Sequence, residues 1–184
     1  MDYRKYQKAR DMTLEILLME NIRELPVSVS ALCRSMGIVM KYYDGADGSD
    51  GESIMMGDTP LILVSRNKPV PRQRFTAAHE LGHVLLGHIG RGKLVNREPS
   101  AYDNPLEHEA NVFASRLLAP ACVLWGCGVR SEQDIMDLCN ISRQAAEFRW
   151  KRMQLLLIRD KFLTSPLELR VYEQFSDYIA THKL

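Results

Sequence analysis

The sequence predicts an α+β fold, in which a small three-stranded sheet packs on one helix and further helices complete the chain. Helical periodicity of apolar residues recurs in several segments that end at proline, glycine or asparagine. Three short runs of strand-like composition lie between residues 38 and 65, separated by stretches rich in aspartate and glycine. The 184 residues, 46% hydrophobic and 26% charged, have the composition of an ordinary globular protein.

The first predicted elements are two helices. Residues 4–24 place their apolar side chains on one helical face and are followed by Pro26. Ser28 or Ser30 can then cap a short helix that ends at Gly37. These helices lead directly into the predicted strands.

Residues 38–43, 53–56 and 61–65 are the predicted strands. The stretch 44–51 joins the first two strands, and its aspartates and glycines predict a hairpin loop. Its acidic residues do not have the spacing of an EF-hand calcium loop. We therefore expect a small sheet without a bound calcium ion at this loop.

The rest of the chain is predicted to be helical. A proline-rich approach at residues 69–71 precedes the helix that we expect to lie on the sheet. Later helices are predicted over residues 106–118, 131–139 and 142–153 and after Pro166. We therefore predict a domain of residues 1–128 and a helical C-terminal extension of residues 129–184.

His79-Glu80-Leu81-Gly82-His83 is the most informative segment of the chain. On a helix, His79 and His83 lie on the same face one turn apart, so both imidazoles can reach one metal ion. Glu80 lies next to these ligands, where it can take a proton from an attacking water molecule. Chance places such a motif in roughly one chain in a hundred of this composition, so it needs support from elsewhere. The alternative is a pair of core histidines that bind backbone carbonyls.

A catalytic zinc site needs a third protein ligand and an open position for water. In the helix of residues 106–118, Glu107 and Asn111 lie on the apolar stripe. Glu109 is rotated by about 200° and is expected to face solvent or a different surface. Glu107 is therefore the predicted third ligand, and Asn111 is expected to orient a ligand histidine or the Glu107 carboxylate. The helix dipole alone also favours a glutamate in the first turn.

Three segments between residues 72 and 150 match the sequence motifs of a known protein family. They are Arg74-Phe75-Thr76-Ala77-Ala78-His79-Glu80-Leu81-Gly82-His83, Glu107-His108-Glu109-Ala110-Asn111-Val112-Phe113-Ala114 with Leu117-Leu118-Ala119-Pro120, and residues 142–149. These segments resemble the ImmA/IrrE metallo-endopeptidases, which are gluzincin-type HExxH zinc peptidases. The resemblance implies that His79, His83 and Glu107 hold the metal and that Glu80 is the general base. One departure is Ala119, where many family members have methionine.

The resemblance implies an endopeptidase with one specific protein substrate, typically a helix-turn-helix repressor of a phage, mobile element or stress response. Zinc is the expected metal, and manganese is also compatible with two imidazoles and one carboxylate. Tyr102, His88 and Arg74 are candidates for steadying the oxyanion, and the sequence does not rank them.

Charge, hydropathy and cysteine spacing bound the remaining possibilities. The net charge of +1 does not indicate a polyanionic partner. The N-terminus lacks a signal-peptide pattern, and no apolar run approaches the length of a membrane span. The 4 cysteines contain no C-x-x-C pair, which agrees with a reducing compartment. We expect a cytoplasmic protein without a membrane partner.

The second hypothesis is a DNA-binding regulator with a structural metal site. Residues 131–153 resemble a helix-turn-helix pair, and Arg149, Lys151 and Arg152 lie on its second helix. Proteins that bind duplex DNA tightly usually have a larger basic excess than this chain, and two short helices also commonly cover a core. Nucleic acid is therefore the less favoured partner.

Overall fold

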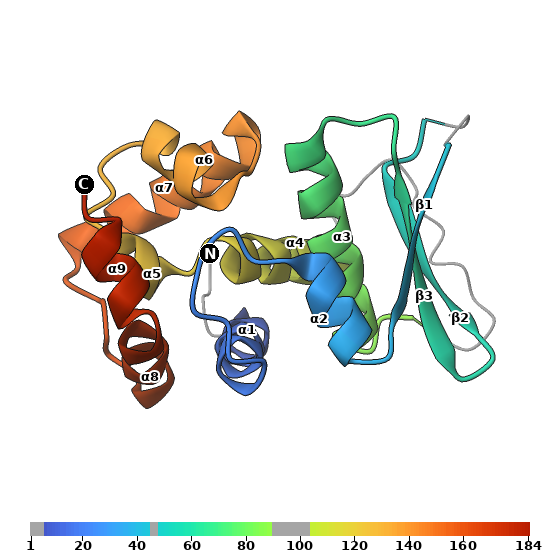
Figure 1. The fold of residues 1–184 in the computed structure, drawn as a ribbon, viewed down its shortest axis with the longest axis horizontal. Helices are drawn as coiled ribbons and strands as arrows, with labels where there is room; N and C mark the ends of the chain where they lie inside the picture. Colours follow the sequence, from blue (N-terminus) through green and yellow to red (C-terminus); the bar gives the residue numbers. More distant parts are fainter. Residues whose placement is uncertain (1–5, 45–47, 90–103) are drawn as a thin grey trace. The chain divides into compact units, whose positions relative to one another are not determined.

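A computed structural model describes residues 6–44, 48–89 and 104–184 of the chain (Figure 1). Helices and a single small sheet make up the described part, which confirms the predicted α+β class. The elements are, in chain order, α1 Gln7–Met19, α2 Val29–Ser35, β1 Val39–Tyr43, β2 Gly51–Met56, β3 Thr59–Ser65, α3 Val70–Leu85, α4 Pro105–Leu118, α5 Ala121–Gly126, α6 Glu132–Cys139, α7 Arg143–Ile158, α8 Pro166–Gln174 and α9 Ser176–Thr181.

The chain divides into two compact units. The sheet unit is Ser28–Ala114, and the helical unit combines Met1–Val27 with Ser115–Leu184. Compact units defined by contacts need not fold independently, so the division into domains of residues 1–128 and 129–184 stays a prediction.

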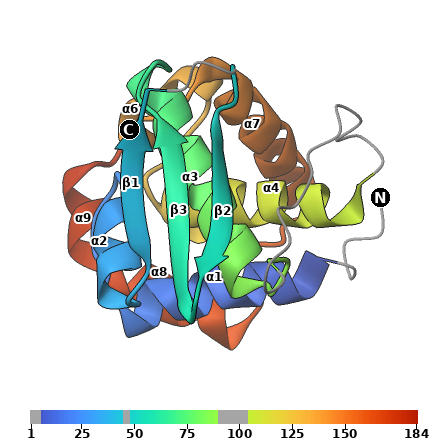
Figure 2. The ribbon, with the colours of Figure 1, turned by 90° about the vertical axis from the view of Figure 1, so that its right-hand side faces the viewer.

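The sheet has the strand order β1-β3-β2, with β3 in the centre (Figure 2). β1 is parallel to β3, and β2 is antiparallel to it. The stretch 44–51 is therefore not the predicted hairpin loop, because β3 lies between the two strands that it joins. The physical reason is burial: Leu61, Ile62 and Val64 make β3 the most apolar strand, which suits a central position.

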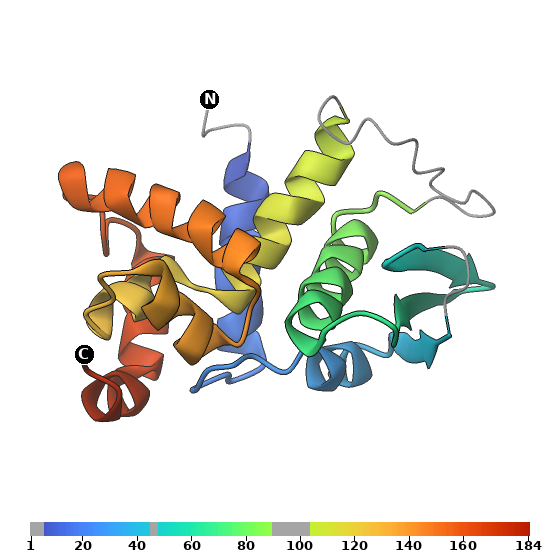
Figure 3. The same cartoon turned by 90° about the horizontal axis from the view of Figure 1, so that it is seen from above.

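One face of the sheet is covered by α3, which contacts β2 and β3 (Figure 3). α2 lies next to β1 and α3, and Ser28 caps it by accepting a hydrogen bond from the Ala31 amide, as the sequence predicted for one of two serines. At the start of α4, the Asn104 side chain accepts a hydrogen bond from the Leu106 amide at 3.0 Å. The sheet and α2 thus provide a fixed support for α3.

The helical unit contains the predicted helix pair, α6 and α7, which pack against each other. Ser131 and Asp134 form a capping box at the start of α6. Asn140 ends α6 in the left-handed region, and Ser142 caps α7. The predicted C-terminal helix is divided at Phe175 into α8 and α9, while α5 is a short helix that the sequence did not indicate.

Candidate metal centre

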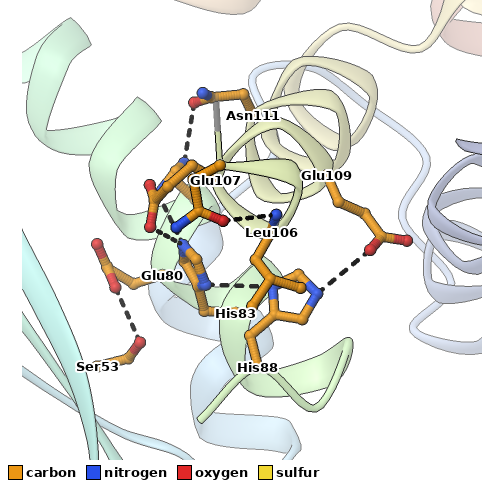
Figure 4. Close-up of polar contacts among 10 residues, drawn as sticks. Ser53, Glu80, His83, His88, Leu106, Glu107, Glu109 and Asn111 are labelled. Carbon is orange, nitrogen blue, oxygen red and sulfur yellow. Dashed lines mark hydrogen bonds and ion pairs between the residues drawn. The ribbon is translucent and has the colours of Figure 1, made fainter. Parts of the chain in front are cut away.

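The second half of α3 is buried throughout, from Thr76 to His83. This burial places the side chains of His79 and His83 inside the sheet unit. Their Nε2 atoms lie 3.0 Å apart. Figure 4 shows His83 of α3 close to Glu107 of α4. Two imidazoles one helical turn apart therefore point at a common position.

Glu107, in the first turn of α4, meets both histidines. Its Oε2 lies 3.1 Å from His79 Nε2, and its Oε1 lies 3.2 Å from His83 Nε2. When the rings of His79 and His83 are protonated at Nε2, their hydrogen bonds hold the pKa of the Glu107 carboxyl well below its usual range. The ligand atoms of the three residues lie within 4.8 Å of one another, so the group can hold one metal ion.

Each histidine also has an outer partner, which is the residue bound to the Nδ1 atom that faces away from Glu107. For His79, this partner determines which ring nitrogen has the proton. Its Nδ1 lies 2.9 Å from the Oδ1 of Asn111, one turn after Glu107 on α4. An amide oxygen only accepts hydrogen bonds, so the Nδ1 of His79 donates and its Nε2 keeps a lone pair in the neutral ring. Asn111 thus occupies one of the two positions predicted for it, against a histidine.

A turn after α3 supplies the outer partner of His83. Gly87 has φ 78°, and the amide of His88 donates to the His83 carbonyl at 2.9 Å, which together form a helix-ending Schellman turn. The turn brings the Nδ1 of His88 to 3.2 Å from the Nδ1 of His83. The Nε2 of His88 lies 3.3 Å from the Oε2 of Glu109.

The carboxylate of Glu109 accepts, so the Nε2 of His88 donates to it and the Nδ1 of His88 accepts from His83. Burial and the neighbouring His83 lower the pKa of His88, in agreement with a neutral ring. Glu109 does point away from Glu107, as its position on the helix predicts, but it is half-buried against His88. Helical periodicity predicted the direction of the Glu109 side chain, but it did not predict the contact with His88.

These hydrogen bonds provide a test of whether the three residues suit a metal ion. With both Nδ1 atoms donating outward, the Nε2 lone pairs and the Glu107 carboxylate face one another at 3.0 to 3.2 Å. Three electron-pair donors repel at this distance unless a cation or protons lie between them. Two imidazole nitrogens and one carboxylate form a donor set that zinc accepts, so the residues fit the metal.

Glu80 lies beside the three residues and is 1% exposed. Its Oε2 accepts a hydrogen bond of 2.8 Å from the hydroxyl of Ser53 on β2. Sequence reasoning did not find Ser53, because a contact between residues 27 positions apart leaves no local pattern. The sheet thus contributes directly to the geometry of the site.

The three predicted oxyanion candidates lie in different places. Arg74 is half-buried on α3, five residues before His79. His88 has its ring nitrogens directed at His83 and Glu109. Tyr102 lies outside the described residues.

Two histidines one turn apart, a neighbouring glutamate and a second carboxylate on the next helix define the class of HExxH metallopeptidases. The model of one such family, the IrrE N-terminal-like domain or Peptidase_M78, matches residues 33–151, which is more than half of the chain. The chain belongs to this family, which confirms the resemblance found in the sequence. No curated protein gave a significant match to the chain. None of the helices in the described residues is long and apolar enough to cross a membrane.

Proposed function

We propose that the chain is a zinc-dependent endopeptidase that hydrolyses a peptide bond in one specific protein, a helix-turn-helix transcriptional repressor of a phage, mobile element or stress response. The observation that supports the reaction is the convergence of His79, His83 and Glu107 on one position beside Glu80. Family membership supports the peptidase class. The repressor as substrate rests on the family resemblance, and the cytoplasm as location rests on the sequence.

His79, His83 and Glu107 would hold the zinc ion, and manganese is the alternative for the same donors. When bound, the ion polarises the scissile carbonyl and makes water easier to deprotonate. Asn111 and the pair His88–Glu109 hold the two imidazoles in the required tautomers.

Glu80 is the proposed general base. It takes a proton from the attacking water and returns it to the leaving amine. The hydroxyl of Ser53 fixes one end of the Glu80 carboxylate, so its orientation is set before a substrate binds. Arg74 and Tyr102 remain proposals for steadying the oxyanion, whereas we assign His88 to positioning His83.

The substitution Glu80→Gln tests this mechanism. It preserves size and leaves the three metal ligands in place, so the metal content should stay near that of the unmodified protein. A glutamine amide cannot accept the proton, and loss of a general base typically costs on the order of 10² to 10⁴ in rate. Metal analysis and the cleavage rate of a helix-turn-helix repressor encoded next to this gene measure the two effects.

Glu52→Gln is the matched control. Glu52 precedes Ser53 on β2 and therefore directs its side chain to the other face of the sheet, so cleavage should be unchanged. A metal-loaded Glu80→Gln protein that cuts at the original rate would show that another residue is the base. An active enzyme that leaves the neighbouring repressor intact would disprove the substrate and not the reaction.

The DNA-binding hypothesis loses one of its three basic residues in the structure. Arg149 is 5% exposed, and its Nε donates to the Ala119 carbonyl at 2.6 Å. A side chain buried in this way does not reach a phosphate of duplex DNA. Electrophoretic shift assays should therefore show only weak, salt-sensitive binding to duplex DNA. Sequence-specific retardation at physiological salt would restore this hypothesis.

A further inference from the structure

The helical unit contains a cavity of about 210 Å³ with a strongly basic lining. The cavity is surrounded by side chains from α1, the last turn of α4, α5, α7, the segment before α8 and α8 itself. The charged residues of this lining, called the arginine pocket below, are Arg10, Arg116, Arg149, Arg152, Lys161 and Glu168. All of them belong to the helical unit, so the pocket is separate from the metal centre of the sheet unit.

The arginine pocket has more positive charge than its carboxylates neutralise. Arg10 pairs with Asp11 at 2.7 Å, and the one carboxylate of the lining, Glu168, acts through its charge on Arg116 and Arg149. Within the described residues, neither Arg116 nor Lys161 forms an ion pair within 4.0 Å of a carboxylate. Burial, reinforced by the charges of Arg149 and Arg152, lowers the pKa of Arg116 to about 9. Buried cations of one sign are costly unless an anion lies among them.

Arg149 gives a second, independent indication. Its side chain is 5% exposed, and the bond from Nε to the Ala119 carbonyl is its one hydrogen bond within the described parts of the chain. The two terminal amino groups of the guanidinium therefore remain as donors at the wall of the pocket. A guanidinium held by one nitrogen presents the other two in the planar arrangement that binds phosphate or carboxylate oxygens.

We propose that the arginine pocket binds a small anion that carries phosphoryl groups. Arg116, Arg149 and Lys161 form no ion pair with a carboxylate within the described residues, and three such cations call for more than one negative charge. Arginine is the residue best suited to phosphate oxygens. The cavity has room for about seven water molecules, which accommodates one or two phosphoryl groups and excludes a duplex or a protein helix.

Isothermal titration of the full, metal-loaded chain with sodium pyrophosphate tests the proposal. We expect saturable binding of about one anion per chain and a rise in the melting temperature with anion concentration, because the anion binds the folded state. Orthophosphate and adenosine triphosphate, titrated separately, show whether a free phosphate or a nucleotide is preferred. The absence of saturable binding, or an equal rise in melting temperature with sodium chloride at the same ionic strength, would overturn the proposal.

Arg116→Gln separates a binding role from a structural one. The substitution should weaken pyrophosphate binding at least tenfold and should raise the melting temperature of the anion-free chain, because it removes a half-buried cation that Arg149 and Arg152 repel. Lys161→Gln, at an exposed position of the lining, should weaken binding without affecting folding. Arg170→Gln, on the exposed face of α8, is the control and should bind as before. Unchanged affinity in both pocket variants would disprove the assignment.

A last variant distinguishes the arginine pocket from the metal centre, where pyrophosphate could also bind to the ion. Glu107→Ala removes a proposed metal ligand and should abolish peptidase activity, yet it should bind pyrophosphate with the original affinity. Loss of binding together with the metal would place the anion at the metal centre and overturn the proposal. Failure of the peptidase mechanism would leave this result unchanged.

Discussion

At the scale of single residues, the two histidines of the metal centre have different outer partners. His79 donates to a neutral amide, whereas His83 donates to an imidazole that is itself bound to the carboxylate of Glu109. A histidine ligand backed by a carboxylate is held in one tautomer and is a stronger base. The metal affinity of the site should therefore depend on His88 and Glu109, which hold the ring of His83.

This difference predicts graded metal affinities. Glu107→Ala should remove the metal, because it leaves two protein ligands, whereas His88→Ala and Glu109→Gln should weaken binding by about 10-fold to 100-fold. Competition with a chromogenic chelator measures the three affinities. Glu173→Gln, at an exposed position on α8, is the control and should bind metal normally. If Glu109→Gln loses as much metal as Glu107→Ala, the assignment of the third ligand is wrong.

At the scale of elements, the position of α4 on α3 depends on Gly82. A Cβ atom at this residue would lie 3.0 to 3.3 Å from three side-chain atoms of Phe113, which is tighter than ordinary contact. Gly82 thus lets α4 approach closely enough for Glu107 to reach both imidazoles. The glycine of the motif therefore has a packing role, beside the residues proposed to bind the metal and to act as the base.

Gly82→Ala should therefore lower both stability and metal affinity. Overpacking of this kind typically costs about 1–3 kcal/mol. Urea unfolding and chelator competition measure the two effects. Phe113→Leu in the same chain should recover part of the loss, because it gives the new methyl group space. Independent, additive effects of the two substitutions would show that the contact does not couple the helices.

A second contact between elements makes stability depend on pH. Asp50, just before β2, binds Arg72 of α3 at 2.6 Å and Lys68 at 3.2 Å. Burial alone would raise the pKa of Asp50, but the hydrogen bonds and charges of Arg72 and Lys68 outweigh burial and lower it. A lowered pKa in the folded state stabilises the protein above the unfolded value of about 3.9, and this stability is lost as the pH falls through the folded value.

Asp50→Asn should accordingly reduce the free energy of unfolding at pH 7 by less than about 1 kcal/mol, since the pair is partly exposed. The difference from the unmodified chain should shrink as the pH falls below about 4. Urea unfolding at pH 7 and pH 3 checks this, with Asp177→Asn on α9 as the control. A difference that grows in acid would contradict the assigned sign.

At the scale of the whole molecule, local patterns in the sequence predicted more than contacts between distant elements. The motif on α3, the glutamate on α4 and the α6–α7 pair follow from helical periodicity and capping, which are local. The central place of β3 depends on pairing between strands. The hairpin predicted at residues 44–51 would have paired β1 with β2, whereas β1 pairs with β3. The bond from Ser53 to Glu80 likewise depends on packing across elements.

The contact of α3 with α4 through the metal centre also has a consequence for the folding equilibrium of the sheet unit. His79 and Glu107 are 28 positions apart, so an ion held by both would close a loop of the chain as a reversible cross-link. For a permanent cross-link of this length, the loss of loop entropy in the unfolded chain contributes about 3–4 kcal/mol. An ion stabilises only through its preference for the folded state, so the melting temperature should rise with free zinc concentration and fall on chelation. Calorimetry across a series of zinc concentrations would measure how much this reversible cross-link raises the melting temperature.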